Sequence, residues 1–147
     1  MERQIKFRAK HITNGAWLYG DLLQSNEGSV YIGVHGQYID DGMHFNDMYD
    51  ETCYVDEDTI GQFTGLYDKN GKEIYEGDII TVKGRYPRVV LWDKMMWALM
   101  PTEYYHDEVF WVMNLQHPGV DWWEEFADEF EIIGNIHDNP SLISNNK

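Results

Sequence analysis

The chain consists of short apolar runs separated by turn residues. Residues 5–10 alternate apolar and basic side chains, and this period of two predicts a β-strand. The apolar set of this strand is expected to face inward: Ile5, Phe7 and Ala9. The basic set is expected to face outward: Lys6, Arg8 and Lys10. Asn14-Gly15 follows and predicts a two-residue type I′ hairpin turn, because both central positions of that turn need a positive φ.

The same succession of apolar runs and turns continues along most of the chain. Asp68-Lys69-Asn70-Gly71 and Glu76-Gly77-Asp78 are typical turn sequences. Residues 85–88, which include Pro87, are expected to form a connecting loop, and residues 35–58 are expected to be rich in loops. Further strands are predicted at residues 16–23, 29–34, 52–55, 60–67, 79–82, 89–92, 95–100, 109–115 and 132–136.

One short helix is predicted near the C-terminus. Asp121 stands three residues before Glu124, which is capping-box spacing, and Pro118-Gly119 precedes them. Phe126 and Phe130 then fall on one side of the helix, with acidic residues on the others. Residues 140–147 are expected to form a frayed tail.

Many short strands separated by Gly, Asn and Asp turns are typical of a small antiparallel barrel or sandwich. The predicted fold class is mainly β: a small antiparallel, SH3-like barrel with extra N-terminal strands and one short C-terminal helix, in which residues 77–100 supply the first strands of the barrel. The length of 147 residues fits a single domain over residues 1–147. The alternative is a division into two β subdomains, residues 1–60 and a barrel-like part at residues 61–140.

Composition narrows the class of protein. Six Trp, ten Tyr and six Phe supply too much apolar surface for a disordered chain. Cys53 is the single cysteine, so no internal disulfide can form, and the N-terminus has no apolar leader segment. No apolar run approaches the roughly 18 residues that a membrane helix needs. We therefore expect a cytoplasmic protein that is not inserted in a membrane.

The charge is strongly negative and unevenly distributed. The chain carries 11 Lys and Arg against 26 Asp and Glu, a formal net charge of −15. Residues 11–68 and 95–146 contain no Lys or Arg, and the cations gather in residues 1–10 and 69–94. The total charge disfavours phosphate binding and favours either a merely solubilising acidic surface or one that meets a basic partner. The gathered cations leave room for a local basic patch.

The sequence contains no complete catalytic or metal-binding motif. The segment Gly65–Lys72 differs from a phosphate-binding loop in its glycine spacing and in Glu73, and the turn at Asp68 departs from calcium-loop spacing. No two of the six histidines have zinc-ligand spacing, although His35, His44 and Asp47 could meet in the fold. Asp50 and Glu51 would suppress the reactive thiolate of Cys53. No catalytic, metal or cofactor-binding residue is predicted, and no cofactor.

Aromatic and basic side chains are the remaining candidates for partner contact. Three tryptophans fall in successive predicted strands and could stack on a base or a sugar, although core or oligomer packing is the more ordinary use of such residues. The predicted partner-contact residues are Lys6, Arg8, Lys10, Arg85, Arg88, Trp92, Trp97 and Trp111. A wider basic patch would add Lys69, Lys72 and Lys83, if the first strand pairs beside the 69–88 segment.

Three segments together resemble the YopX family of phage and prophage proteins: residues 5–9, the run from Gly61 to Ile79, and residues 133–140. The central run, from Phe63 to Asp78, is the most distinctive, and the order and spacing extend the resemblance over nearly the whole chain. The resemblance implies a mainly β protein encoded in phage or mobile bacterial DNA. It implies no activity, catalytic residue or ligand for any residue here, and residues 35–58 lie outside its pattern.

The leading expectation is a non-enzymatic phage accessory protein that binds a host or phage protein, or itself as a homo-oligomer, through a β surface and an acidic face. One version is a nucleic-acid mimic that occupies the DNA groove of a basic host protein. The alternative is a nucleic-acid-binding β-barrel that uses the local basic patch. An enzyme that gathers distant His and carboxylate groups is the third hypothesis.

Overall fold

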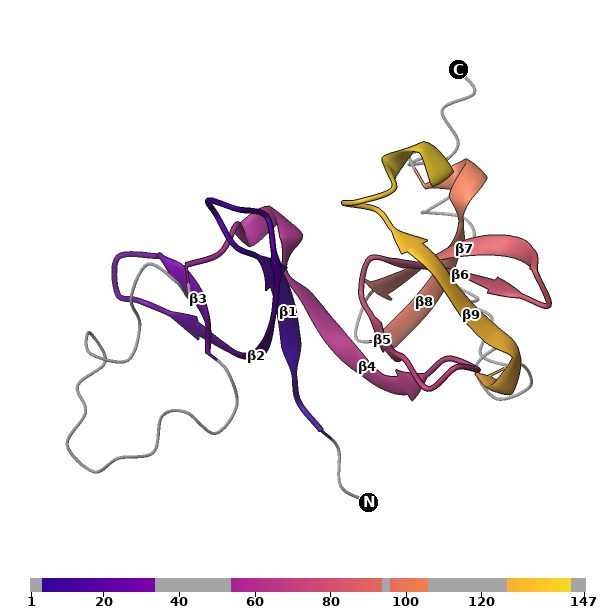
Figure 1. The fold of residues 1–147 in the computed structure, drawn as a ribbon, viewed down its shortest axis with the longest axis horizontal. Coiled ribbons are helices and arrows are strands. Elements are labelled where there is room, and N and C mark those ends of the chain that lie inside the picture. The colour runs from indigo at the N-terminus through magenta and orange to yellow at the C-terminus, as the bar shows by residue number, and fades with distance from the viewer. Residues whose placement is uncertain (1–3, 34–53, 94–95, 106–126, 144–147) are drawn as a thin grey trace. The chain divides into compact units, whose positions relative to one another are not determined.

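The computed structural model describes residues 4–33, 54–93, 96–105 and 127–143 (Figure 1). The chain divides into two compact units, Met1–Phe63 and Thr64–Lys147. The described residues are mainly β, in two antiparallel sheets with strand orders β3-β2-β1-β4-β5 and β8-β7-β6-β9. Strand β4 (Gly61–Tyr67) runs across the boundary between the units. The mainly β prediction is confirmed, whereas neither sheet closes into the predicted barrel among the described strands.

The first unit contains β1 (Phe7–Lys10), β2 (Trp17–Gln24) and β3 (Val30–Gly33). β1 pairs with β2 along its whole length and with the start of β4 through Phe7 and Arg8. Two isolated bridges extend this sheet: Val55 pairs with His11, directly after β1, and Tyr54 pairs with Tyr31 of β3. The apolar face of these elements encloses one core, centred on Ala9, Val30, Ile32 and Val55.

The hairpin between β1 and β2 differs from the predicted two-residue turn. Gly15 adopts φ +71°, whereas Asn14 is not among the residues with positive φ. The N–H of Gly15 donates to the carbonyl of His11 at 3.0 Å, and the N–H of His11 donates to Ala16 at 2.8 Å. The loop therefore spans four residues, and the Asn14 side chain accepts the N–H of Ala16 instead of taking a left-handed backbone.

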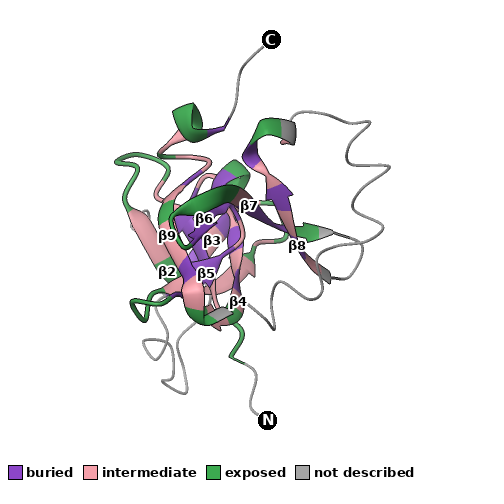
Figure 2. Ribbon diagram, turned by 90° about the vertical axis from the view of Figure 1, so that its right-hand side faces the viewer, coloured by how far each residue is buried: buried purple, intermediate pink, exposed green. Residues whose placement is uncertain are grey.

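The second unit contains β5 (Glu73–Tyr75), β6 (Asp78–Val82), β7 (Arg85–Asp93), β8 (Met96–Pro101) and β9 (Phe130–Asn135). All five residues of β6 are buried (Figure 2) because apolar clusters cover both faces of the sheet. Ile79 packs with Val89 and Met100 on one face. Ile80 packs with Val90 and Phe130 on the other. This two-sided burial explains why apolar residues, Ile79 and Ile80, point to both faces of this strand.

Short 3₁₀ turns complete the fold: η2 (Glu57–Thr59), η3 (Thr102–Tyr104), η4 (Ala127–Glu129) and η5 (Pro140–Leu142). The predicted helix is wrong at its described end, because residues 127–129 form η4 and Phe130 begins β9. Its start at Asp121, and the predicted strand at residues 109–115, lie outside the described residues. The predicted frayed tail is also wrong where it is described, because Ile143 is buried in the β6–β8 core.

Candidate interaction surfaces

The tip of the β6–β7 hairpin, residues 82–88, has an unusual backbone. Residues 85–88, expected to be a loop, belong to β7, and the two-residue turn lies at Lys83-Gly84. Both turn residues have positive φ, 53° and 71°, as a type I′ turn requires. Thr81 then faces two residues, Tyr86 and Pro87, in a bulge where Tyr86 has φ +57°. Each non-glycine residue in this region costs about 1–2 kcal/mol of backbone strain.

The tip combines basic and aromatic side chains, of which those of residues 83–87 are exposed, Arg88 is half-buried and Val82 belongs to the core. Tyr86 is 56% exposed, and the guanidinium of Arg88 lies 5.9 Å from its ring centre. The Lys83 side chain is 67% exposed, with its amine 3.5 Å from the Glu129 carboxylate. Burial lowers the pKa of the Arg88 guanidinium, and the nearby charge of Glu103 opposes that shift. The hairpin extends away from the rest of the second sheet (Figure 1), and Lys83, Arg85 and Arg88 all lie near its tip.

Two of the predicted tryptophans meet at the other end of β7. Trp92 and Trp97 are direct cross-strand partners on β7 and β8, with ring centres 4.9 Å apart in an edge-to-face arrangement. Trp92 is 44% exposed, whereas Trp97 packs against the core beneath the sheet. Trp111, the third predicted tryptophan, lies outside the described residues, and so do Cys53, His35, His44 and Asp47.

The basic strand β1 differs from its predicted outward face. Arg8 is only 6% exposed, and its guanidinium carbon lies over the Trp17 ring, 4.6 Å from the ring centre. The amine of Lys10 stands 5.5 Å from the same ring, and Lys6 is half-buried. Ile5, predicted to face inward, is exposed because it precedes the paired part of the strand. The alternation of apolar and basic residues predicts which face of the strand each side chain occupies, but it does not predict how exposed that side chain is.

The cations of the predicted wider patch separate into two groups. Those of β1 belong to the first unit, and those at positions 69–88 belong to the second. In the second unit Lys69 forms an ion pair of 2.9 Å with Glu131, and Lys83 pairs with Glu129. Glutamates of β9 and η4 thus partly neutralise these lysines, a long-range pairing that had no signal in the sequence. A combined patch of both groups stays a prediction.

The turn at Asp68 is a structural element. The Asp68 carboxylate is buried and accepts the N–H groups of Asn70, Lys72 and Ile132 at 2.8, 2.9 and 3.1 Å. Burial alone would raise the pKa of Asp68, but these three donors hold it below its ordinary value. The predicted turn is confirmed, with Gly71 at φ +81°.

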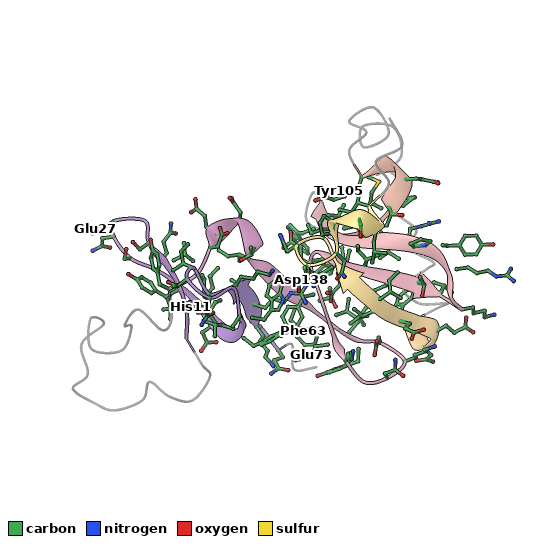
Figure 3. All side chains as sticks on the ribbon, turned by 45° about the horizontal axis from the view of Figure 1, so that its top comes forward. His11, Glu27, Phe63, Glu73, Tyr105 and Asp138 are labelled. Carbon is green, nitrogen blue, oxygen red and sulfur yellow. The ribbon has the colours of Figure 1, made fainter. Side chains whose placement is uncertain are left out.

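A second polar network closes the C-terminal turn after β9, where Asp138 is labelled in Figure 3. The side-chain oxygen of Asn135 accepts the N–H groups of His137 and Asp138 at 3.0 and 2.8 Å. The Asn135 N–H donates to the side chain of Asn139 at 3.1 Å. These hydrogen bonds stabilise the turn after β9, just as those of the Asp68 carboxylate stabilise the turn between β4 and β5.

Within the residues that the structure describes, no three His, Cys, Asp or Glu side chains are grouped so that they could hold a metal ion. In the same part of the chain, no helix has the length and apolar character needed to cross a membrane.

These features define an all-β protein of two compact units, with exposed aromatic side chains at both ends of β7, exposed basic side chains at its start, and the buried carboxylates of Asp68 and Asp78 bonded to backbone turns. A family model described as YopX protein matches residues 6–144, and the chain belongs to this family. The chain is similar to the crystal structure of protein EF1440 from Enterococcus faecalis, with 25% identity and a TM-score of 0.56. That similarity covers 97% of this chain and 100% of the other. No curated protein gave a significant match.

Proposed function

We propose that this chain is a non-enzymatic accessory protein of a phage or prophage that binds a basic protein partner, or a second copy of itself, at the surface around Trp92. The observation that carries the proposal is the exposed Trp92 ring set edge-on against Trp97. Tryptophan is enriched among the few residues that dominate protein interfaces, because it buries a large area with few rotatable bonds.

The position of this ring favours binding. Trp97, its cross-strand neighbour, packs against the core, so the Trp92 ring contacts a side chain that is itself anchored in the core. A side chain fixed before association loses little conformational entropy when a partner covers it. An exposed aromatic ring that is already oriented suits a contact surface better than a purely structural role.

The charge of the chain supports a basic partner. With a net charge of −15, the field of the protein attracts cationic surfaces and speeds their association. The described buried carboxylates add no catalytic alternative. Asp68 holds three backbone N–H groups, and Asp78 accepts the N–H of Tyr75 at 2.7 Å within the turn before β6. Both are committed to backbone turns.

The test is capture of partners from bacterial lysate at low and high salt, with wild type and Trp92→Ala. Tyr67→Ala is the matched control, because Tyr67 is an aromatic residue of β4 with a similar exposure of 50%. Loss of an interface tryptophan costs about 2 kcal/mol, so Trp92→Ala should retain roughly 30-fold less partner. Light scattering of the purified variants tests self-association.

The expected partner binds wild type and Tyr67→Ala equally, binds Trp92→Ala weakly, and dissociates as salt is raised. A concentration-dependent dimer of wild type that Trp92→Ala abolishes would support the self-association form. Equal recovery of all proteins by wild type and Trp92→Ala, together with a monomeric wild type, would contradict the proposal.

A further inference from the structure

We propose that the tip of the β6–β7 hairpin, residues 82–88, binds single-stranded nucleic acid, with Tyr86 stacking on a base and Arg85, Lys83 and Arg88 contacting phosphates. The inference goes beyond the proposed protein contact and is independent of it. Trp92 and Arg85 stand at opposite ends of β7, about 20 Å apart at the usual rise per residue.

The backbone of the tip is strained at two residues. Lys83 and Tyr86 both adopt left-handed φ, 53° and 57°, where glycine would fit without strain. Tyr86 is 56% exposed, so burial of its ring in this chain does little to offset that strain. Strained residues of this kind concentrate at functional sites. The bulge at Tyr86 and Pro87 also changes the direction of the strand, which presents the ring at the tip.

The positive charge of the tip complements the phosphates of a nucleic acid. Residues 79–92 contain three cations and no acidic residue, in a chain whose net charge is −15. All three cations lie between residues 83 and 88 of the tip, two before Tyr86 in the sequence and one after it. An aromatic ring among cations matches a single strand, because bases stack on the ring while the cations follow the phosphates. In a duplex the faces of the bases are already stacked.

The acidic total does not exclude this contact. At physiological salt, charges more than about 8 Å apart are largely screened, so the local cations determine the interaction with a phosphate. Among the described residues, Glu129 lies beside Lys83 and Glu103 lies near Arg88. The Lys83–Glu129 pair is long, at 3.5 Å, and its lysine is exposed, so the Lys83 amine can leave the pair for a phosphate at low cost.

The test is fluorescence anisotropy of a labelled 20-nucleotide oligothymidine at 50 mM salt, with the full chain. Wild type should bind, and its affinity should fall about 20-fold between 50 and 200 mM salt if three phosphates are contacted. Tyr86→Gly should weaken binding about tenfold. Its melting temperature should stay the same or rise, because glycine relieves the left-handed backbone. Arg85→Glu should weaken binding by a similar factor and make the salt dependence shallower.

Matched controls separate this site from general effects. Tyr67→Ala removes an exposed tyrosine of β4, and Asn26→Glu adds a negative charge on an exposed turn outside the predicted basic patch. Both should bind as wild type does. No binding by wild type at 50 mM salt would overturn the proposal. Equal loss in the controls, or equal affinity for a duplex of the same length, would also overturn it.

A remaining outcome concerns a protein partner at the same tip. If Tyr86→Gly binds oligothymidine normally and instead loses a captured protein, the tip is a protein contact and the nucleic-acid assignment is wrong. Failure of the Trp92 experiment alone leaves this inference intact, because Trp92→Ala does not alter the tip.

Discussion

The carboxylate of Asp68 accepts the backbone N–H of Ile132 at 3.1 Å, across 64 positions of the sequence. Beside this contact the N–H of Lys69 donates to the carbonyl of Phe130 at 2.7 Å. The β4–β5 turn therefore occupies the outer edge of β9 at Phe130 and Ile132, where an additional strand would otherwise bind. A turn that is distinctive in the sequence thus joins the beginning of the second unit to its last strand.

Replacing Asp68 should destabilise the second unit. Asp68→Ala removes the acceptor of three backbone N–H groups, and hydrogen bonds to a charged group are among the stronger ones. We expect the free energy of unfolding to fall by about 3 kcal/mol in urea titrations. Asp128→Ala, at an exposed position of η4, is the control and should change it by less than about 0.5 kcal/mol. A loss no larger than that of the control would contradict the role of Asp68.

The contribution of Asp68 should also depend on pH. Its folded pKa is lowered below the ordinary value of 3.8, since backbone donors outweigh the effect of burial. A lowered pKa means that the stabilisation is present above the unfolded pKa and is lost as pH falls through the folded pKa. The difference in unfolding free energy between wild type and Asp68→Asn should therefore be constant above about pH 5 and shrink below 3.8. Urea midpoints between pH 2 and 6 measure it, and a constant difference throughout would refute the assignment.

The strands were predictable where burial follows a local pattern. The apolar run at β6 and the turns before and after it define the strand without tertiary information, because all its side chains are buried. Phe130 shows where a local pattern fails to predict the structure. Its spacing from Phe126 suggests a helix, but the residue pairs with Val82 on β6, a contact between distant parts of the chain. Non-local pairing overrides a short local pattern.

The candidate surfaces were only partly predictable. Arg85, Arg88 and the tryptophan pair could be named from residue type and spacing. The left-handed backbone at Tyr86 could not, because the tyrosine itself gives no signal for positive φ, and the bulge depends on pairing with Thr81. The Arg8 guanidinium lies over Trp17, a residue of the next strand. Such contacts follow from register, which alternation alone does not specify.

Gly134 and Asn139 form a close approach that only glycine permits. A Cβ added at position 134 would lie 2.5 Å from the side-chain oxygen of Asn139 and 3.1 Å from its Cβ. Gly134→Ala should displace Asn139, break its hydrogen bond with the N–H of Asn135, and cost about 2 kcal/mol in chemical unfolding. The double variant with Asn139→Ala should be less destabilised than the two single changes added together. Strict additivity would show that the two residues do not meet.

Ile143 should stabilise the core of the second unit although it stands close to the C-terminus. Its side chain is 5% exposed and belongs to the same cluster as Ile79, Val89 and Met100. The N–H of Ile143 donates to the carbonyl of Pro140 at 3.1 Å, which fixes the residue at the end of η5. Ile143→Ala should lower the free energy of unfolding by about 3 kcal/mol, since a buried isoleucine leaves a cavity. Leu142→Ala is the matched control, because its neighbouring side chain is exposed and should cost less than about 1 kcal/mol. Thermal unfolding of both variants beside wild type tests the prediction, and equal effects at the two positions would mean that the C-terminal segment does not pack on the core.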